Sequence, residues 1–147
     1  MRLPAIVLLL VAAPALAQAP NASPIGMWQT FDDDTHAPKA LVEIAAHGGL
    51  LSGRIVKLSR ATGDDPNPRC TQCAGDRHDQ PVLGMTILWN FRRDGDAWDG
   101  GEVLDPESGD VYRASLHLLD GGKRLDVHGY IGIPLLGRSQ VWDRQGP

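Results

Sequence analysis

Cys70 and Cys73 form the pattern in this sequence that is best suited to chemistry, and they are its only two cysteines. Two cysteines at this spacing can form a disulfide, supply half of a zinc site or act as a redox dithiol. A redox motif needs its first cysteine at a helix N-terminus, where the helix dipole lowers the thiol pKa. The surrounding segment is instead a loop rich in Pro, Asp and Gly. We therefore expect a structural disulfide, with metal binding and redox chemistry as the alternatives.

A metal site would need two further ligands near these cysteines. The sequence contains no second C-x-x-C and no H-x-x-x-H. The charged run around His78 is also typical of a solvated turn, so we expect neither a metal nor a cofactor. The side chains that could complete such a site are Asp76, His78 and Asp79 nearby in the sequence, and His36 and His47 from other loops.

Hydrolytic chemistry has candidate residues but no recognisable setting. Ser108, Ser115 or Ser139 would have to pair with His117 or His128. None of these serines lies in the G-x-S-x-G turn of a nucleophile elbow. We expect no catalytic residue, and an enzyme is the less favoured class.

The length of 147 residues suits one domain preceded by a short targeting segment. Arg2, the apolar run 5–13 and the small-x-small sequence Ala15-Leu16-Ala17 predict a signal peptide over residues 1–17, too short to span a bilayer. A polar lead-in over 18–24 and one domain over 25–147 follow. We expect export to the periplasm or to the medium.

The charge balance argues against several classes of partner. The formal net charge of −4 becomes −5 once Arg2 is removed, and no basic stripe is present. Nucleic acid and an anionic membrane surface are therefore disfavoured as main partners. No long apolar stretch follows residue 21, so the mature chain is not expected to span a membrane.

A predicted hairpin over residues 84–105 is the clearest structural unit of the chain. Alternation in its first half predicts that Met85, Ile87, Trp89 and Phe91 share a buried face. Asp94-Gly95 suits the tight turn, and Gly100-Gly101 in the return strand suits a bulge. The hairpin ends at Asp105-Pro106, because proline cannot donate to a sheet ladder.

The same pattern of alternation and Gly-rich turns recurs along the domain without a convincing amphipathic helix. It predicts an all-β fold, a single antiparallel eight-stranded up-and-down barrel, which removes the edge strands of an open sheet. A β-sandwich is the competing architecture. The expected strands cover 25–31, 39–46, 50–58, 85–92, 97–104, 109–119, 123–130 and 136–144.

One irregular segment, residues 59–81, contains both cysteines and is long for a domain of this size. Such loops are usually functional or locally stapled. It motivates an alternative function, an envelope module that binds a protein partner through this loop.

Several motifs together resemble a known family. Gly26-Met27-Trp28 looks like the G-x-W of lipocalin-type barrels, which place a cation from the last strand against that Trp. Arg138, Trp142 and Arg144 lie on the expected last strand, and we expect Arg138 to be this cation and to close the barrel floor. The wider pattern resembles a family of small exported bacterial proteins, catalogued as a domain of unknown function with a lipocalin-like barrel. It consists of Cys70-x-x-Cys73-x-Gly75-Asp76, Gln80-Pro81-x-x-Gly84, Trp98-x-x-Gly101, Asp105-Pro106-x-x-Gly109-x-x-Tyr112, and Gly129-Tyr130-Ile131-Gly132 through Gly137-Arg138-x-Gln140-x-Trp142.

This resemblance covers residues 25–144 and implies the barrel fold. It implies no activity and no catalytic residue. An eight-stranded barrel is just wide enough to be filled by side chains or to hold one small ligand.

The inward-facing side chains are the remaining candidate site. Our leading hypothesis is a carrier or sensor of a small apolar or amphipathic ligand in the cell envelope, although the same residues would also suit a packed core. The candidate ligand-binding residues are Trp28, Met85, Ile87, Trp89, Tyr112, Leu116 and Val127, with Arg138 and Gln140 as polar partners.

Overall fold

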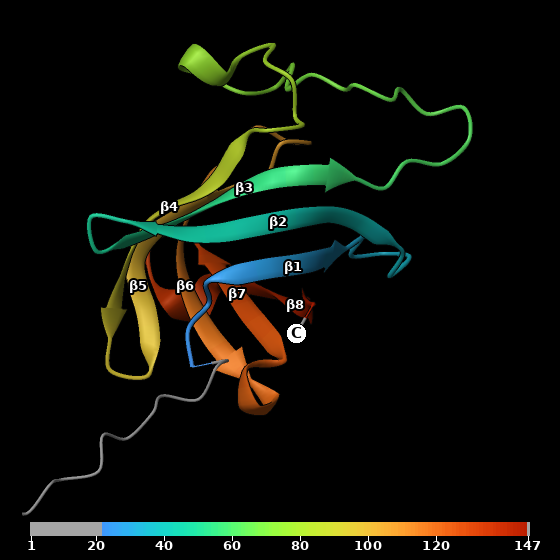
Figure 1. Cartoon of the computed structure of the whole chain (residues 1–147). Helices are drawn as coiled ribbons and strands as arrows, with labels where there is room; N and C mark the ends of the chain where they lie inside the picture. Colours follow the sequence, from blue (N-terminus) through green and yellow to red (C-terminus); the bar gives the residue numbers. More distant parts are fainter. Residues whose placement is uncertain (1–21, 147) are drawn as a thin grey trace, which may run out of the picture.

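The chain folds into one closed barrel of eight antiparallel strands in sequential order (Figure 1). The computed structural model describes residues 22–146, so the expected signal peptide lies outside the described residues. The strands are β1 Gly26–Phe31, β2 Pro38–His47, β3 Leu50–Leu58, β4 Thr86–Asp94, β5 Ala97–Leu104, β6 Val111–Leu119, β7 Arg124–Tyr130 and β8 Arg138–Gln145. Three short 3-10 turns, η1 Gly75–Arg77, η2 Asp120–Gly122 and η3 Pro134–Leu136, lie in the connections.

Each strand pairs with the next along the chain, and β1 closes the barrel against β8. The predicted barrel is therefore confirmed, and the sandwich alternative is wrong. We call the barrel end that carries the β1–β2, β3–β4, β5–β6 and β7–β8 connections the mouth. The opposite end, with the β2–β3, β4–β5 and β6–β7 turns, is the floor. No helix among the described residues is long and apolar enough to cross a membrane.

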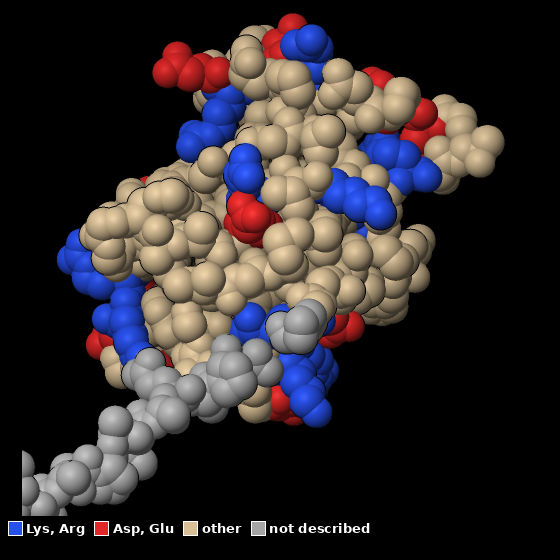
Figure 2. All heavy atoms as spheres, in the orientation of Figure 1, with Lys and Arg blue, Asp and Glu red and all other residues tan. Residues whose placement is uncertain are grey.

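Positive and negative side chains are interspersed on the face shown in Figure 2, without a continuous basic stripe. This distribution agrees with the slightly acidic composition of the chain.

The barrel interior is filled by large apolar side chains. They come from all eight strands, so every strand contributes to one core. Burying each such side chain stabilises the fold by about 1.5–3 kcal/mol. The largest fully buried side chains on the strands belong to Trp28, Val42, Ile44, Leu88, Phe91, Leu116 and Leu125.

The expected phase of β4 was wrong in its middle. Leu88, not Trp89, is fully buried, and Phe91 is buried three residues later. Register shifts occur on both sides of Leu88 against β3, and Asn90 has a φ of 64°. These bulges turn Trp89 out of the alternating pattern, because an inserted residue reverses the faces that follow it. The bulge expected at Gly100-Gly101 is present in the β5–β6 ladder.

The floor is closed by Arg144, not by Arg138 as expected. The Arg144 guanidinium lies 4.3 Å from the centroid of the Trp28 ring. In the β1–β8 ladder Trp28 pairs directly with Arg144. Arg138 lies six residues before Arg144, at the mouth end of β8, a separation of about 20 Å along an extended strand. Register therefore decides which arginine meets the tryptophan.

Arg144 also ties the chain ends together through hydrogen bonds to backbone carbonyls. Its Nε donates to Gly122 at 2.7 Å, Nη1 to Ile25 at 2.9 Å and Nη2 to Ser23 at 2.6 Å. Burial of the guanidinium lowers the pKa of Arg144. A Cβ on Gly26 would lie 2.8 Å from Arg144 Nη1, which explains why a glycine precedes this tryptophan by two positions.

Candidate ligand site at the barrel mouth

A groove of about 530 Å³ opens at the mouth between the β1–β2 loop and the start of β8. Its wall is open because the β1–β8 ladder has only three residue pairs and its mouthward end is the pair Gln29–Asp143. Beyond that pair the two strands separate. We call this hollow the mouth groove; it is lined by Phe31, Asp32, Asp33, Asp34, His36, Arg138, Ser139, Gln140 and Val141.

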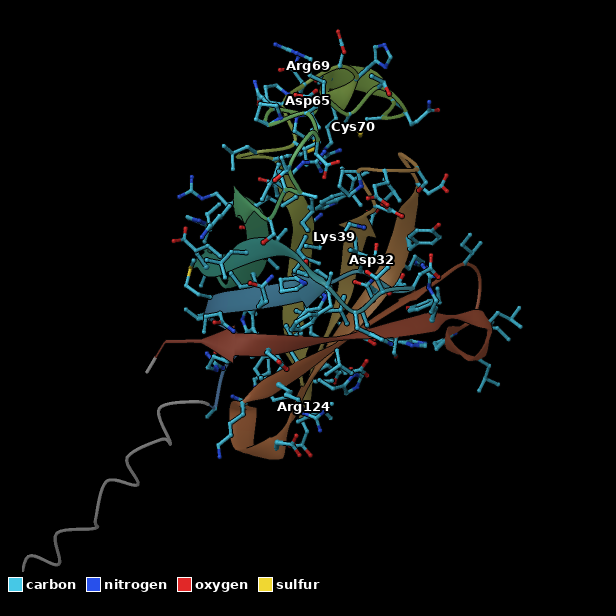
Figure 3. All side chains as sticks on the ribbon, turned by 90° about the vertical axis from the view of Figure 1, so that its right-hand side faces the viewer. Asp32, Lys39, Asp65, Arg69, Cys70 and Arg124 are labelled. Atoms are coloured by element: carbon cyan, nitrogen blue, oxygen red, sulfur yellow. A yellow bond between two sulfur atoms is a disulfide. The ribbon has the colours of Figure 1, made fainter. Side chains whose placement is uncertain are left out.

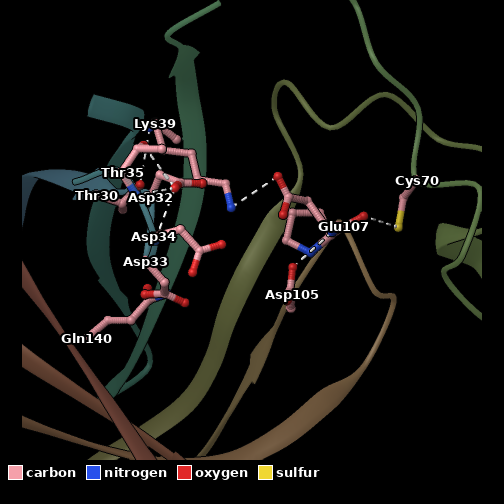
Figure 4. Close-up of polar contacts among 12 residues, drawn as sticks. Thr30, Asp32, Asp33, Asp34, Thr35, Lys39, Cys70, Asp105, Glu107 and Gln140 are labelled. Atoms are coloured by element: carbon pink, nitrogen blue, oxygen red, sulfur yellow. Dashed lines mark hydrogen bonds and ion pairs between the residues drawn. The ribbon is translucent and has the colours of Figure 1, made fainter. Parts of the chain in front are cut away.

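The β1–β2 loop is held in shape by one aspartate. Asp32 Oδ1 accepts hydrogen bonds from the backbone N–H of Asp34 at 3.1 Å and of Thr35 at 2.9 Å, and from the Thr35 hydroxyl at 2.9 Å (Figure 4). These bonds to Thr35 lower the pKa of Asp32. Such a turn fixes the neighbouring Asp33 on the side that faces β8.

Asp33 is the end of a chain of polar contacts that begins inside the barrel. The indole N–H of buried Trp142 donates to Gln140 Oε1 at 3.2 Å, and Gln140 Nε2 donates to Asp33 Oδ1 at 2.9 Å. Arg138 Nη2 lies 3.2 Å from the other oxygen, Asp33 Oδ2. The side chain of Arg138 is 73% exposed, so this ion pair is in contact with water.

The arrangement can bind an anionic or hydrogen-bonding head group. Arg138 and Gln140 present two N–H donors that converge on one carboxylate, the geometry that also suits a ligand carboxylate or phosphate. Phe31 and Val141 supply apolar surface beside them. Among residues 22–146 no group of three or more His, Cys, Asp or Glu side chains is arranged to hold a metal ion.

The residues expected to face a ligand fall into three groups. Arg138 and Gln140 meet at the mouth groove. Tyr112 lies elsewhere at the mouth, where its hydroxyl donates to Asp110 Oδ2 at 3.3 Å. Burial, followed by the charge of Asp110, raises the Tyr112 pKa. Trp89 is partly buried, with the Arg77 guanidinium 4.2 Å from its ring centroid.

The third group belongs to the packed interior. Its members are all buried in the same cluster, and a ligand contact at these positions stays a prediction. They are Trp28, Met85, Ile87, Leu116 and Val127.

Sequence reasoning missed the contribution of the β1–β2 loop to the site. The run Asp32 to Asp34 predicted only a turn. Asp33 becomes part of the site because closure of the barrel places the end of β1 beside the start of β8. The available signal was charge: an acidic run after the first strand faces Arg138 on the last.

The expected disulfide between Cys70 and Cys73 is present, and both residues are buried. Cys70 Sγ lies 3.2 Å from the Pro106 carbonyl oxygen, a packing contact because an oxidised sulfur has no proton to donate. A Cβ on Gly109 would lie 2.0 Å from the Gln72 carbonyl oxygen. The disulfide loop is therefore seated directly on the turn between β5 and β6 (Figure 4).

The environment of this disulfide favours a structural role. His78 contacts the Cys73 carbonyl oxygen through Nδ1 at 3.0 Å, so its ring helps to hold the loop. The Cys70 N–H donates to the Gln80 carbonyl and the Asp79 N–H donates to the Cys70 carbonyl, each at 2.8 Å. In Figure 3 the part of the loop that carries Asp65, Arg69 and Cys70 projects above the strands of the barrel. Both sulfurs are shielded from solvent, so an external thiol cannot easily reach them for disulfide exchange.

One of the serine–histidine pairs considered for hydrolysis does form. His128 Nδ1 lies 2.9 Å from Ser139 Oγ, and its Nε2 lies 2.7 Å from the Pro134 carbonyl oxygen. The carbonyl can only accept, so in the neutral ring Nε2 carries the proton and Nδ1 accepts from the serine hydroxyl. We interpret this arrangement as a brace for the β7–β8 connection.

A second hollow of about 720 Å³ lies at the floor, beside the β4–β5 hairpin. Its lining contains two arginines and two aspartates, Arg92, Arg93, Asp94 and Asp99. It is lined mostly by exposed side chains, and the guanidinium of its Arg93 lies 5.4 Å from the ring centroid of buried Trp98. The mouth groove is the better candidate, because it alone is linked to the barrel interior by hydrogen bonds.

Comparison with known proteins identifies the family and the fold. The family model described as "Uncharacterized protein conserved in bacteria (DUF2147)" matches residues 26–144. Among solved structures, the chain is similar to one described as "Protein HP1028 from the human pathogen Helicobacter pylori belongs to the lipocalin family". The TM-score is 0.70 at 16% sequence identity, covering 83% of this chain and 82% of that one. No curated protein matches the sequence.

Proposed function

The chain belongs to the DUF2147 family of uncharacterized bacterial proteins, and from its mouth groove we propose that it binds a small amphipathic molecule in the cell envelope. The lipocalin-like barrel is consistent with ligand binding. The observation that carries the proposal is the open wall between β1 and β8, where Arg138 and Gln140 converge beside Phe31 and Val141.

The groove suits a ligand with one polar end. Its volume of about 530 Å³ is within the range of about 300–1,000 Å³ that small-molecule sites occupy. The head group would take the donors of Arg138 and Gln140 in place of Asp33. The apolar part would lie against Phe31 and Val141 and extend toward the buried Trp142.

Export is the second part of the proposal. A disulfide-bonded cysteine pair is typical of an oxidising compartment. The apolar run and the Ala15-Leu16-Ala17 sequence near the start of the chain support a cleaved signal peptide. Together they support a periplasmic or secreted protein that meets its ligand outside the cytoplasm.

Native mass spectrometry of the protein exported by a bacterial host tests the proposal. We expect the wild type to carry an additional mass that leaves on denaturation, and Arg138→Gln to lose most of it. Arg54→Gln is the matched control, because Arg54 and Glu43 form another exposed ion pair away from the groove. A bare wild-type mass, unchanged after incubation with an extract of envelope lipids, would contradict the proposal.

A second candidate function is protein binding through residues 59–81. The supporting observation is that this loop is exposed and also held rigid, by the disulfide, by the Arg69–Pro81 bridge and by the bond from Arg69 Nη1 to the Asp79 carbonyl at 2.9 Å. Proximity labelling from the loop in intact cells tests it. A reproducible partner that is lost when the loop is shortened supports it; no reproducible partner counts against it.

A further inference from the structure

The β7–β8 connection exposes a concentrated apolar surface at the mouth. Four large apolar side chains occur within six residues, and they are exposed by 69% at Ile131, 53% at Ile133, 90% at Leu135 and 74% at Leu136. We call residues 131–136 the apolar tip. Single exposed apolar residues are ordinary, but a cluster of this kind marks an interaction surface.

The apolar tip is held in a defined shape. His128 contacts the Pro134 carbonyl through Nε2 at 2.7 Å and Ser139 through Nδ1 at 2.9 Å, which ties the tip to both of its strands. Residues 134–136 form the turn η3, with Pro134 at its start. A preorganised tip inserts or docks at a lower entropic cost than a mobile one.

The charges around the tip indicate what it meets. Residues 129–137 carry no charged side chain. Arg138, which pairs with Asp33, follows the tip after Gly137, and Arg113, which lies opposite Glu102 on β5, is the cross-strand neighbour of Tyr130 at its base. An uncharged apolar projection with an aromatic residue and arginines at its base is complementary to a lipid bilayer, where acyl chains lie beneath a layer of phosphates.

We propose that the apolar tip inserts into the surface of a membrane, with Arg113 and Arg138 at the level of the lipid phosphates. A protein partner or a second copy would have to cover four apolar side chains that project from a narrow connection, whereas a bilayer covers them from all sides. The slightly acidic chain gains no general attraction to anionic lipids. Insertion therefore rests on the apolar side chains and persists at high salt.

This inference goes beyond ligand binding and does not depend on it. It also has a geometric consequence for the mouth groove. Residues 138–141 line the groove and are separated from the tip by Gly137 alone, so the inserted tip would hold the groove at the lipid surface. The projecting β7–β8 connection is visible at the right-hand side of Figure 3.

Flotation of the exported chain with vesicles tests the proposal. Two kinds of vesicle serve as probes, one of phosphatidylcholine and one of phosphatidylethanolamine with phosphatidylglycerol. We expect the wild type to float with both kinds and to remain bound at high salt. Replacing Leu135 and Leu136 together by serine should lower the bound fraction at least about tenfold. The reason is that each leucine side chain loses the favourable free energy of transfer from water into the bilayer.

Leu83→Ser is the matched control, since Leu83 is an apolar side chain exposed by 47% in a different loop. It should float like the wild type, and all variants should keep the wild-type unfolding temperature because the altered residues are exposed. The proposal is overturned if the wild type stays in the dense fractions, if binding disappears at high salt, or if the tip variant floats as well as the wild type. It is also overturned if the tip variant instead dissociates a dimer or releases a protein partner while the wild type does not float.

Discussion

The floor and the mouth of this barrel are built from the same two strands and behave oppositely. At the floor, β1 and β8 pair, and Arg144 binds three carbonyls beneath Trp28. At the mouth the two strands separate, and Arg138 forms an exposed ion pair with Asp33. The two arginines of this strand have different roles: the half-buried Arg144, with three hydrogen bonds, closes the barrel floor, whereas the exposed Arg138 leaves a groove at the mouth.

The largest contrast is expected from removing these two arginines in turn. Arg144→Ala should lower the free energy of unfolding by about 3 kcal/mol, because it loses charge-assisted hydrogen bonds and the contact with Trp28. Arg138→Ala should change it by less than about 1 kcal/mol, as is usual for an exposed ion pair. Urea unfolding followed by tryptophan fluorescence measures both. Equal losses of unfolding free energy for the two variants would contradict a structural role for Arg144 that Arg138 does not share.

Gly109→Ala should have the next largest effect, confined to the mouth. Its Cβ would lie 2.0 Å from the Gln72 carbonyl oxygen, and its φ of 76° disfavours other residues. We expect a loss of about 2 kcal/mol or more and release of the loop over residues 59–81. Limited proteolysis should then cut that loop well before the barrel. Gly121→Ala, with a positive φ but open space around it, is the control for backbone strain alone.

Asp33→Ala should change the affinity of the groove for ligands and leave the free energy of unfolding nearly unchanged. It frees the donors of Arg138 and Gln140, so affinity for an anionic amphiphile such as dodecanoate should rise several-fold. Affinity for dodecylammonium should fall, because a carboxylate is lost. Calorimetric titration with the two probes measures both changes. A parallel change for both probes would mean that Asp33 does not compete with the head group.

The smallest effect is expected when acid protonates Asp32 and weakens the β1–β2 loop. The pKa of Asp32 is lowered in the folded chain by its bonds to Thr35, so the carboxylate favours folding at pH values above the unfolded pKa, near 3.8. This contribution is lost as the pH falls from there through the folded pKa. The protection of the Thr35 amide against exchange should fall in that range before the protection of the Trp28 indole N–H does. Asp32→Asn should move Thr35 exchange toward its acid value at neutral pH.

The strand pattern was readily predicted because alternation and Gly-rich turns are local properties. Leu50–Leu58 and Ala97–Leu104 have the expected bounds, and the C-x-x-C loop contains the expected disulfide. The choice between Arg138 and Arg144 was not predictable in the same way. It depends on the β1–β8 register, which is set by closure of the whole barrel.

The candidate site was predicted only in part for a related reason. Arg138 and Gln140 were expected as polar ligand contacts, but the groove itself arises where the β1–β8 ladder ends. The residue types alone suggest an unbroken alternation in β4, which assigned Trp89 to the buried face. The bulges around Leu88 interrupt this alternation, and the sequence gives no local signal for them. Contacts between residues more than a hundred positions apart, such as Gln140 with Asp33, follow from topology and not from local sequence.

The most direct test of the central claim is a nuclear magnetic resonance titration of the protein with dodecanoate and, separately, dodecylammonium. The account predicts that at least one probe shifts the amides of residues 33–36 and 138–141, while the Trp28 indole and the amides of residues 143–145 stay unchanged. Shifts concentrated at the floor, or no saturable shift with either probe, would contradict a ligand site at the mouth.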